Sequence, residues 1–241
     1  MADSVAEYAT SCLGLTPPYS IVKDVFGYQY HDGQQTYETD LSVLTQIRLG
    51  KQKSVNIAAI LVGHEDDFSG AVSRTQVRNI QGAIQIMRNI YGTVNLGVRK
   101  IYWQRIGLAQ AGGYVNIANR SEAEDLTDDW SSPTDGIDVF FVQSIGDAGG
   151  WSNVDGPCSK NSKDDLTGAV VSLTNPVPFL GVLTAHEVAH YLKLSHTNSA
   201  TNLMGQDANN DGIAELTNAN RVLTTAQGNS MKSHCFVKNP C

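Results

Sequence analysis

Apolar residues along the chain form two kinds of pattern, which predict strands and helices in alternation. Nearly continuous apolar runs at 55–62, 136–142 and 168–173 are typical of strands buried on both faces, and 98–106 resembles a further strand. Residues 74–91 instead carry apolar positions three and four apart, which predicts a helix. Those positions are Val77, Ile80, Ile84, Met87 and Ile90. This order of strand, helix and strand predicts an α/β-type sheet.

Local signals predict where other helices begin and end. Gly92 is the expected end of the first helix. Residues 121–130 predict a short acidic helix, with Ser121 as its N-cap and Glu124 completing a capping box. Residues 216–231 predict a helix close to the C-terminus.

A further predicted helix carries the clearest candidate chemistry. It follows Pro176 and Pro178, which do not fit a helix interior, and contains His186. Apolar residues at helical spacing predict that it is buried in the core, where it would be a rigid base for a site. These residues are Val182, Leu183, Ala185, Val188, Ala189 and Leu192.

Three histidines and a glutamate in this stretch predict a metal centre. His186 and His190 are four residues apart, so a helix places both imidazoles on one face, within reach of one ion. Glu187 lies beside the first histidine, where a carboxylate can take a proton from a metal-bound water. His196 becomes a third ligand if the helix stops near Lys193 and the chain turns back. Three nitrogen ligands with one open position are typical of catalytic zinc. The alternative is a core helix that carries histidines by chance.

The whole pattern resembles the metzincin zinc endopeptidases, whose signature is H-E-x-x-H-x-x-G-x-x-H followed by a turn that contains Met. The three histidines and Glu187 fall on its functional positions, and residues 202–205 (Asn-Leu-Met-Gly) resemble the Met-turn. The resemblance implies that Met204 forms an apolar floor under the metal. It also implies an α+β fold. This fold has a twisted, mixed five-stranded sheet with a backing helix and an active-site helix, and a small C-terminal subdomain with the Met-turn and a C-terminal helix.

The sequence departs from the family pattern at several points. The family's glycine is Lys193 here, so either Lys193 takes a positive φ at a cost of about 1 kcal/mol or more, or the helix ends differently. The link from His196 to Met204 is short, and no tyrosine follows Met204 closely. Thr197 resembles the pappalysin branch more than the adamalysin (reprolysin-like) branch, but one residue does not assign the subfamily.

The resemblance also implies an antiparallel edge strand along the active-site cleft. Trp151, Ser152, Asn153 and Val154 form a short strand-compatible run between glycines at the corresponding place. Such a strand would offer free backbone groups to an extended substrate. A plain surface loop is the alternative.

Oxygen-bearing side chains after the Met-turn resemble the first half of a calcium loop. Asp207, Asn209 and Asp211 alternate along the chain, with Ile213 at the seventh position. The twelfth position, where an EF-hand has a bidentate Glu, is Asn218, so the match is partial. The alternative is a turn rich in Asn and Asp.

The chain is expected to contain two parts. Residues 1–50 carry no catalytic motif and are predicted to be an N-terminal extension or the remnant of a pro-segment. Residues 51–241 are predicted to be the catalytic domain, with an upper subdomain at 51–196 and a lower subdomain at 197–241.

Two interpretations of the first part remain. Runs of β-prone residues on both sides of Asp32-Gly33 predict a hairpin. The segment either inhibits the enzyme, with Cys12 donating a thiolate to zinc, or packs on the catalytic domain with Cys12 in a disulfide. We favour the second, because structural cysteine pairs are common in secreted chains.

The four cysteines bear on the compartment. None forms a C-x-x-C pair, which argues against a thiolate zinc site or a redox motif, and their even number suggests two disulfides. The adamalysin-like branch pairs a cysteine before its last strand with the C-terminal helix. It therefore implies that Cys158 pairs with Cys235 or Cys241, and Cys12 with the other. Four reduced, buried thiols are the alternative.

Composition narrows the partners. The chain has 241 residues, 41% of them hydrophobic, and a formal net charge of −7. The acidic balance argues against nucleic acid and anionic membranes as partners, and no apolar run approaches the ~20 residues of a membrane helix. No signal peptide is visible at the start. The cysteines still favour a secreted, extracellular protein, and we expect a monomer.

These features together predict a zinc-dependent endopeptidase acting on protein or peptide substrates, with Zn²⁺ as cofactor and Ca²⁺ as a candidate second ion. One alternative is a latent or non-catalytic binding module on a metzincin scaffold. The other is a zinc hydrolase of a non-peptide amide.

Overall fold

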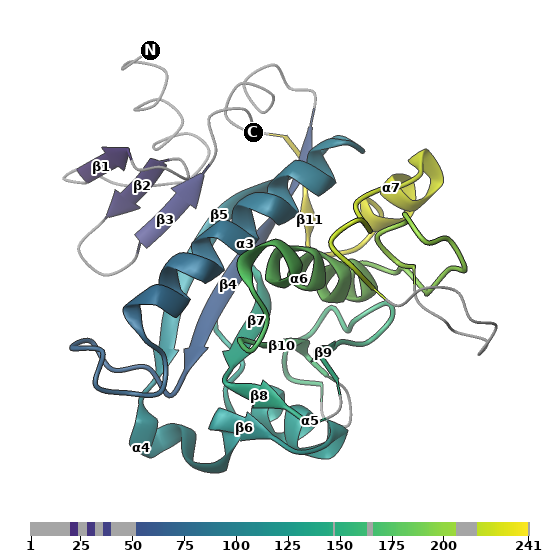
Figure 1. Cartoon of the computed structure of the whole chain (residues 1–241). Helices are drawn as coiled ribbons and strands as arrows, with labels where there is room; N and C mark the ends of the chain where they lie inside the picture. Colours follow the sequence, from purple (N-terminus) through teal and green to yellow (C-terminus); the bar gives the residue numbers. More distant parts are fainter. Residues whose placement is uncertain are drawn as a thin grey trace.

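The computed structural model describes residues 52–146, 148–162, 166–205 and 216–240, together with three short strands nearer the N-terminus (Figure 1). These are β1 (Ser20–Lys23), β2 (Tyr28–His31) and β3 (Thr36–Thr39). They form an antiparallel three-stranded sheet, and the pairing of β2 with β3 confirms the predicted hairpin. Cys12 lies outside the described residues, so the role of the first fifty residues stays a prediction.

Four parallel strands form the body of a separate six-stranded sheet. They lie in the order β5 (Leu96–Ile106), β4 (Lys53–Val62), β7 (Ile137–Val142) and β10 (Gly168–Ser172). Each strand occupies one of the predicted runs. Every residue of β4 after Lys53 is buried, and successive residues face opposite cores. This burial on both faces explains why its sequence is continuously apolar rather than alternating.

Two short antiparallel strands complete the sheet. Strand β9 (Gly150–Trp151) pairs antiparallel with the outer edge of β10. Together with the four parallel strands it makes up the mixed, five-stranded sheet that was predicted. Strand β11 (Val237–Lys238) pairs with the beginning of β4 and was not predicted. It brings the end of the described chain back to the middle of the sheet.

Helices α3 (Arg74–Gly92) and α6 (Val177–Tyr191) pack against each other on one face of the sheet (Figure 1). A Cβ atom at Gly181 would lie 2.6 Å from Cβ of Ile86, so this glycine allows the two helices to approach closely. The buried Tyr91 hydroxyl donates a hydrogen bond to the Ala185 carbonyl at 2.7 Å. Helix α3 therefore serves as the predicted backing helix for α6.

Short elements cover the opposite face. Their buried residues belong to the second core, together with Ala58, Ile60 and Phe140 of the sheet. The elements are α4 (Leu108–Ala111), the 3₁₀ helix η1 (Gly112–Val115), β6 (Asn116–Ile117), α5 (Arg120–Asp129) and β8 (Ser144–Ile145), and β6 pairs with β8.

The predicted start of α5 was wrong by two residues. Asn119, not Ser121, is the N-cap, and its side chain accepts a hydrogen bond from the backbone of Glu122 at 3.1 Å. Glu122 in turn accepts one from the backbone of Ala118 at 2.8 Å. The helix begins with the predicted type of cap, a polar residue followed by Glu three positions later. Both Asn119 and Ser121 have a Glu at this spacing, and the structure uses the earlier of the two.

The predicted C-terminal helix was too long. Helix α7 spans only Thr225–Met231, with Thr224 as its N-cap. The preceding residues form a turn in which Asn220 accepts hydrogen bonds from the backbone and hydroxyl of Thr217, at 2.9 and 2.8 Å. These side-chain contacts compete with helix formation. No helix in the described part of the chain is long and apolar enough to cross a membrane.

Candidate metal centre

Helix α6 presents His186, Glu187 and His190 from the core of the molecule. All three side chains are buried, although they are polar. Pro176 precedes the helix, as predicted. Pro178 was also predicted to precede it, but it lies in the first turn, where a missing N–H costs nothing. The remaining surface of α6 packs on the sheet and on α3, which fixes the helix in place.

The chain turns directly after α6 because Lys193 takes the left-handed conformation, with φ of 81°. The Lys193 N–H donates to the His190 carbonyl at 2.9 Å, and the Leu194 N–H donates to the Ala189 carbonyl at 3.0 Å. These two bonds form a Schellman motif, which usually has glycine at the position of Lys193. Of the two alternatives left by the sequence, Lys193 therefore accepts the strain, and the helix ends as the resemblance implied.

This turn brings the three histidines together. The Nε2 atoms of His186 and His190 lie 2.9 Å apart, those of His190 and His196 also 2.9 Å, and those of His186 and His196 3.2 Å. In a tetrahedral site with Zn–N distances of about 2.0–2.1 Å, ligand nitrogens lie about 3.3 Å apart. The three side chains therefore have close to the spacing that a single metal ion requires.

Backbone carbonyls orient two of the rings. Nδ1 of His186 lies 2.7 Å from the Leu203 carbonyl, and Nδ1 of His190 lies 2.6 Å from the Leu194 carbonyl. A carbonyl can only accept, so each Nδ1 carries the proton and each Nε2 directs a lone pair to the common centre. Lone pairs that converge in this way repel one another unless a cation lies between them, and the donor set thus fits zinc.

The environment keeps the histidines neutral. Burial lowers the pKa of His186 to about 3 and that of His190 to about 4, and charge repulsion from neighbouring histidines adds to the effect. Burial also lowers the pKa of His196. Neutral imidazole is the form that binds a metal.

The pKa of Glu187 is shifted in the opposite direction to the pKa values of the histidines. Burial raises the pKa of its carboxyl to about 8, because the charged form is poorly solvated there. A cation nearby would favour the charged form again. A carboxyl whose pKa lies near neutrality is suited to taking up and releasing a proton.

The predicted Met-turn is a tight turn that supports His186. Asn202 accepts a hydrogen bond from the backbone N–H of Met204 at 2.9 Å, and the Thr197 N–H donates to the Met204 carbonyl at 2.8 Å. Met204 is fully buried in the main core. The turn thereby places the Leu203 carbonyl against the His186 ring.

The edge strand lies nearer the N-terminus than expected. Only Trp151 of the predicted run belongs to β9, while Ser152, Asn153 and Val154 follow it outside the strand. The strand ends because the chain leaves β10 to cover the end of α6. There the backbone N–H groups of Asp155 and Gly156 donate to the last carbonyls of the helix, at 3.0 and 2.9 Å.

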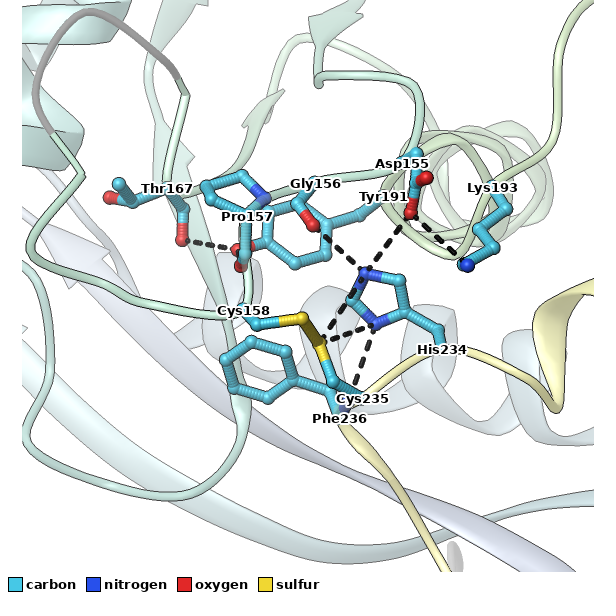
Figure 2. Close-up of a disulfide and its surroundings, with 10 residues drawn as sticks. All are labelled: Asp155, Gly156, Pro157, Cys158, Thr167, Tyr191, Lys193, His234, Cys235 and Phe236. Atoms are coloured by element: carbon cyan, nitrogen blue, oxygen red, sulfur yellow. Dashed lines mark hydrogen bonds and ion pairs between the residues drawn. A yellow bond between two sulfur atoms is a disulfide. The ribbon is translucent and has the colours of Figure 1, made fainter.

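A disulfide holds this covering segment in place. Cys158 is bonded to Cys235, which is one of the two partners that the resemblance implied for it, while Cys241 lies outside the described residues (Figure 2). His234 donates from Nε2 to the Gly156 carbonyl at 2.9 Å. The Lys193 ammonium lies 3.6 Å from the Asp155 carboxylate. The end of α6 is thus tied to the C-terminal segment.

The sequence did not reveal the backbone carbonyls that orient the rings, since any residue provides a carbonyl. It also did not reveal that Gly150 contacts Glu187, although the pair Gly149-Gly150 was a visible signal. The candidate calcium residues Asp207, Asn209, Asp211 and Ile213 lie outside the described residues, so calcium stays a prediction.

Comparison with known proteins gives distant similarities only. No protein-family model matches the sequence, and no curated protein matches it. Among solved structures, the chain is similar to archaemetzincin from Methanopyrus kandleri, with 11% identity and a TM-score of 0.48, over 75% of this chain and 95% of that one. It is also similar to metalloproteinase-II from Bacteroides fragilis, with 10% identity and a TM-score of 0.47, over 74% of this chain and 52% of that one.

Proposed function

We propose that this chain is a zinc-dependent endopeptidase. His186, His190 and His196 hold the zinc ion, and Glu187 is the general base. The observation that carries the proposal is the convergence of three Nε2 atoms, 2.9–3.2 Å apart, beside a buried carboxyl group on the same helix. Met204 belongs to the apolar support beneath this centre.

The protein's own groups have distinct tasks in hydrolysis. Zinc, when bound, supplies a Lewis acid that makes water more acidic and polarises a carbonyl. Glu187 accepts the proton of the attacking water and delivers it to the leaving amine. The Leu194 and Leu203 carbonyls hold the ligand rings in one tautomer, so the site needs no rearrangement before reaction.

The substrate is proposed to be a protein or peptide in extended conformation. Strand β9 pairs with β10 on one side, and no described strand pairs with its other side. An extended peptide can add to such an edge by main-chain hydrogen bonds. We propose that Trp151 and the residues after it, Ser152, Asn153 and Val154, contact the substrate next to Glu187.

The disulfide is compatible with a secreted protein, and secretion is part of the proposal. The Schellman turn at Lys193 removes the main sequence argument for a degenerate site, because the substitution leaves the three ligands in place.

The proposal is tested by metal analysis together with a cleavage assay. Elemental analysis should find one zinc per chain, and casein should be cleaved in a way that a chelator abolishes and added zinc restores. One zinc without cleavage of casein or a peptide library would favour the binding module or the amide hydrolase. A folded protein that binds no zinc would overturn the proposal.

A further inference from the structure

The side chain of Glu187 packs directly against the backbone of Gly150 in the edge strand. A Cβ atom added to Gly150 would lie 2.7 Å from Cγ of Glu187, 2.9 Å from its Oε1 and 3.0 Å from its Cδ. Carbon atoms in van der Waals contact lie about 3.5–4.0 Å apart, so no side chain at position 150 is compatible with the present place of the carboxyl group.

Backbone conformation does not explain this glycine. Gly150 lies in a β-strand and is not among the described residues with positive φ, so any amino acid could take its conformation. What requires glycine is the close approach of the Glu187 side chain.

Both sides of the contact are held by rigid elements. Gly150 is opposite Val171 in the β9–β10 pair, and the Gly149 carbonyl accepts a hydrogen bond from the Ser172 N–H at 2.9 Å. Glu187 lies in the C-terminal half of α6, which packs against the sheet and α3. An added methyl group would therefore displace the flexible Glu187 side chain rather than either backbone.

Hydrogen bonds do not hold the Glu187 carboxyl group in the described part of the chain. No residue in the described ranges donates a hydrogen bond to it, whereas His186 and His190 each have a backbone partner. The buried carboxyl group is therefore positioned by packing, and Gly150 is one of the groups against which it packs.

We infer that Gly150 is a positioning residue for the general base: its bare α-carbon lets the edge strand close over Glu187 and fixes the carboxyl group between strand and metal ligands. This inference rests on the proposed function. It also links the strand proposed to bind substrate to the group proposed to move the proton.

The test is Gly150→Ala, with Gly149→Ala as the matched control. A methyl group at position 149 would lie nearest the terminal carbons of the Leu183 side chain, at 3.1 and 3.3 Å, and none of the three nearest atoms belongs to Glu187. Misplacing a catalytic group by about 1 Å can cost about 100-fold in rate. We expect Gly150→Ala to lower kcat about 10- to 100-fold, with KM and zinc content nearly unchanged, and Gly149→Ala to lose less than about threefold.

A double-mutant cycle separates positioning from general damage to the strand. If Gly150 acts through Glu187, Gly150→Ala should have little further effect on the residual rate of a Glu187→Gln protein. Equal fold losses in both backgrounds would overturn the inference, and so would equal losses for the two alanine variants.

Crystal structures of the zinc-loaded variants give a readout that needs no activity. The Glu187 carboxyl group should move by about 1 Å in Gly150→Ala and stay in place in Gly149→Ala; an unmoved carboxyl in Gly150→Ala would overturn the inference. If the wild type cleaves no peptide, the proposed function fails, but this structural test still shows whether Gly150 determines the position of the Glu187 carboxyl group.

Folding of the variant needs its own safeguard. If Gly150→Ala does not fold, the double variant Gly150→Ala/Glu187→Ala should, because alanine at position 187 lacks the Cγ, Cδ and Oε1 atoms that the added methyl group would meet. Failure of that protein to fold would show that the edge strand, not Glu187, requires the glycine.

Discussion

Lys193 has a backbone conformation that is unfavourable for residues other than glycine, and the ion pair of its side chain with Asp155 partly offsets this cost. Its φ of 81° costs about 1 kcal/mol relative to glycine, while its ion pair with Asp155 is half-exposed and contributes roughly 0–1 kcal/mol. We expect Lys193→Gly to change the unfolding free energy of the metal-free protein by about 0 to +1 kcal/mol in urea denaturation. Lys193→Ala keeps the strain and loses the ion pair, so it should be the less stable of the two. A glycine variant less stable than the alanine variant would contradict this account.

Catalysis and zinc binding should respond differently to a change at Glu187. Glu187→Gln keeps the size of the side chain and removes its basicity. We expect it to lower kcat for casein cleavage by at least about 100-fold while zinc content stays at one per chain. Activity within tenfold of the wild type in a zinc-replete sample would exclude Glu187 as the base.

The opposite pKa shifts in the site predict how stability depends on pH. The histidine pKa values are lowered, so the unfolded chain binds more protons below about pH 6.5, and the metal-free protein loses stability as pH falls from there. The pKa of Glu187 is raised from 4.5 to about 8, so the folded chain holds a proton that the unfolded chain has lost between these values, and stability falls with rising pH until about pH 8. Urea denaturation with a chelator present should show a stability maximum near pH 6.5. In Glu187→Gln, the decrease in unfolding free energy above the pH of the maximum should be smaller. An unchanged decrease would mean that other groups cause it.

At the scale of elements, Asn202 connects the Met-turn to α7. Its side chain accepts from the Met204 N–H and exchanges two hydrogen bonds with Gln227, at 2.9 and 3.0 Å. Asn202→Ala would leave buried groups unpaired and loosen the turn that carries the Leu203 carbonyl. We expect a loss of about 1–3 kcal/mol in stability and a roughly 10-fold weaker zinc affinity, measured by competition with a chromophoric chelator. Gln227→Ala, which leaves the Met204 contact in place, is the control and should affect zinc less.

The elements that could be predicted from sequence are those in which the pattern of apolar side chains alone determines the secondary structure. The four parallel strands, α3 and α6 follow from continuous or helical apolar spacing. The histidine cluster follows from the spacing of His186 and His190 on α6 and from His196 after the helix. The errors lie where several polar residues compete for one role, as at Asn119 and Ser121, or where side-chain hydrogen bonds break a weak helix, as at Thr217. The length of β9 depended on where its pairing with β10 ends, which no local pattern encodes.

At the scale of the molecule, the disulfide joins segments 77 residues apart. Replacing Cys158 and Cys235 together by serine leaves no unpaired thiol at this place and should lower the unfolding free energy by about 2–4 kcal/mol, because the unfolded chain gains freedom. Urea denaturation of the zinc-loaded proteins measures the difference. An unchanged midpoint and slope would mean that the hydrogen bonds of His234 hold the segment without the covalent link.

The proposed zinc ligands and the proposed base depend on different amounts of the chain. All three candidate ligands, and the two carbonyls that orient His186 and His190, come from one continuous stretch between residues 186 and 203. These residues come together by local chain closure, which is fast. The contact between Glu187 and Gly150 instead requires that a strand 37 positions earlier has already joined the sheet, so it belongs to the completed fold. Under the proposed function, we therefore expect a partly unfolded chain to keep its zinc but not to cut peptides, so that it does not digest itself while it folds.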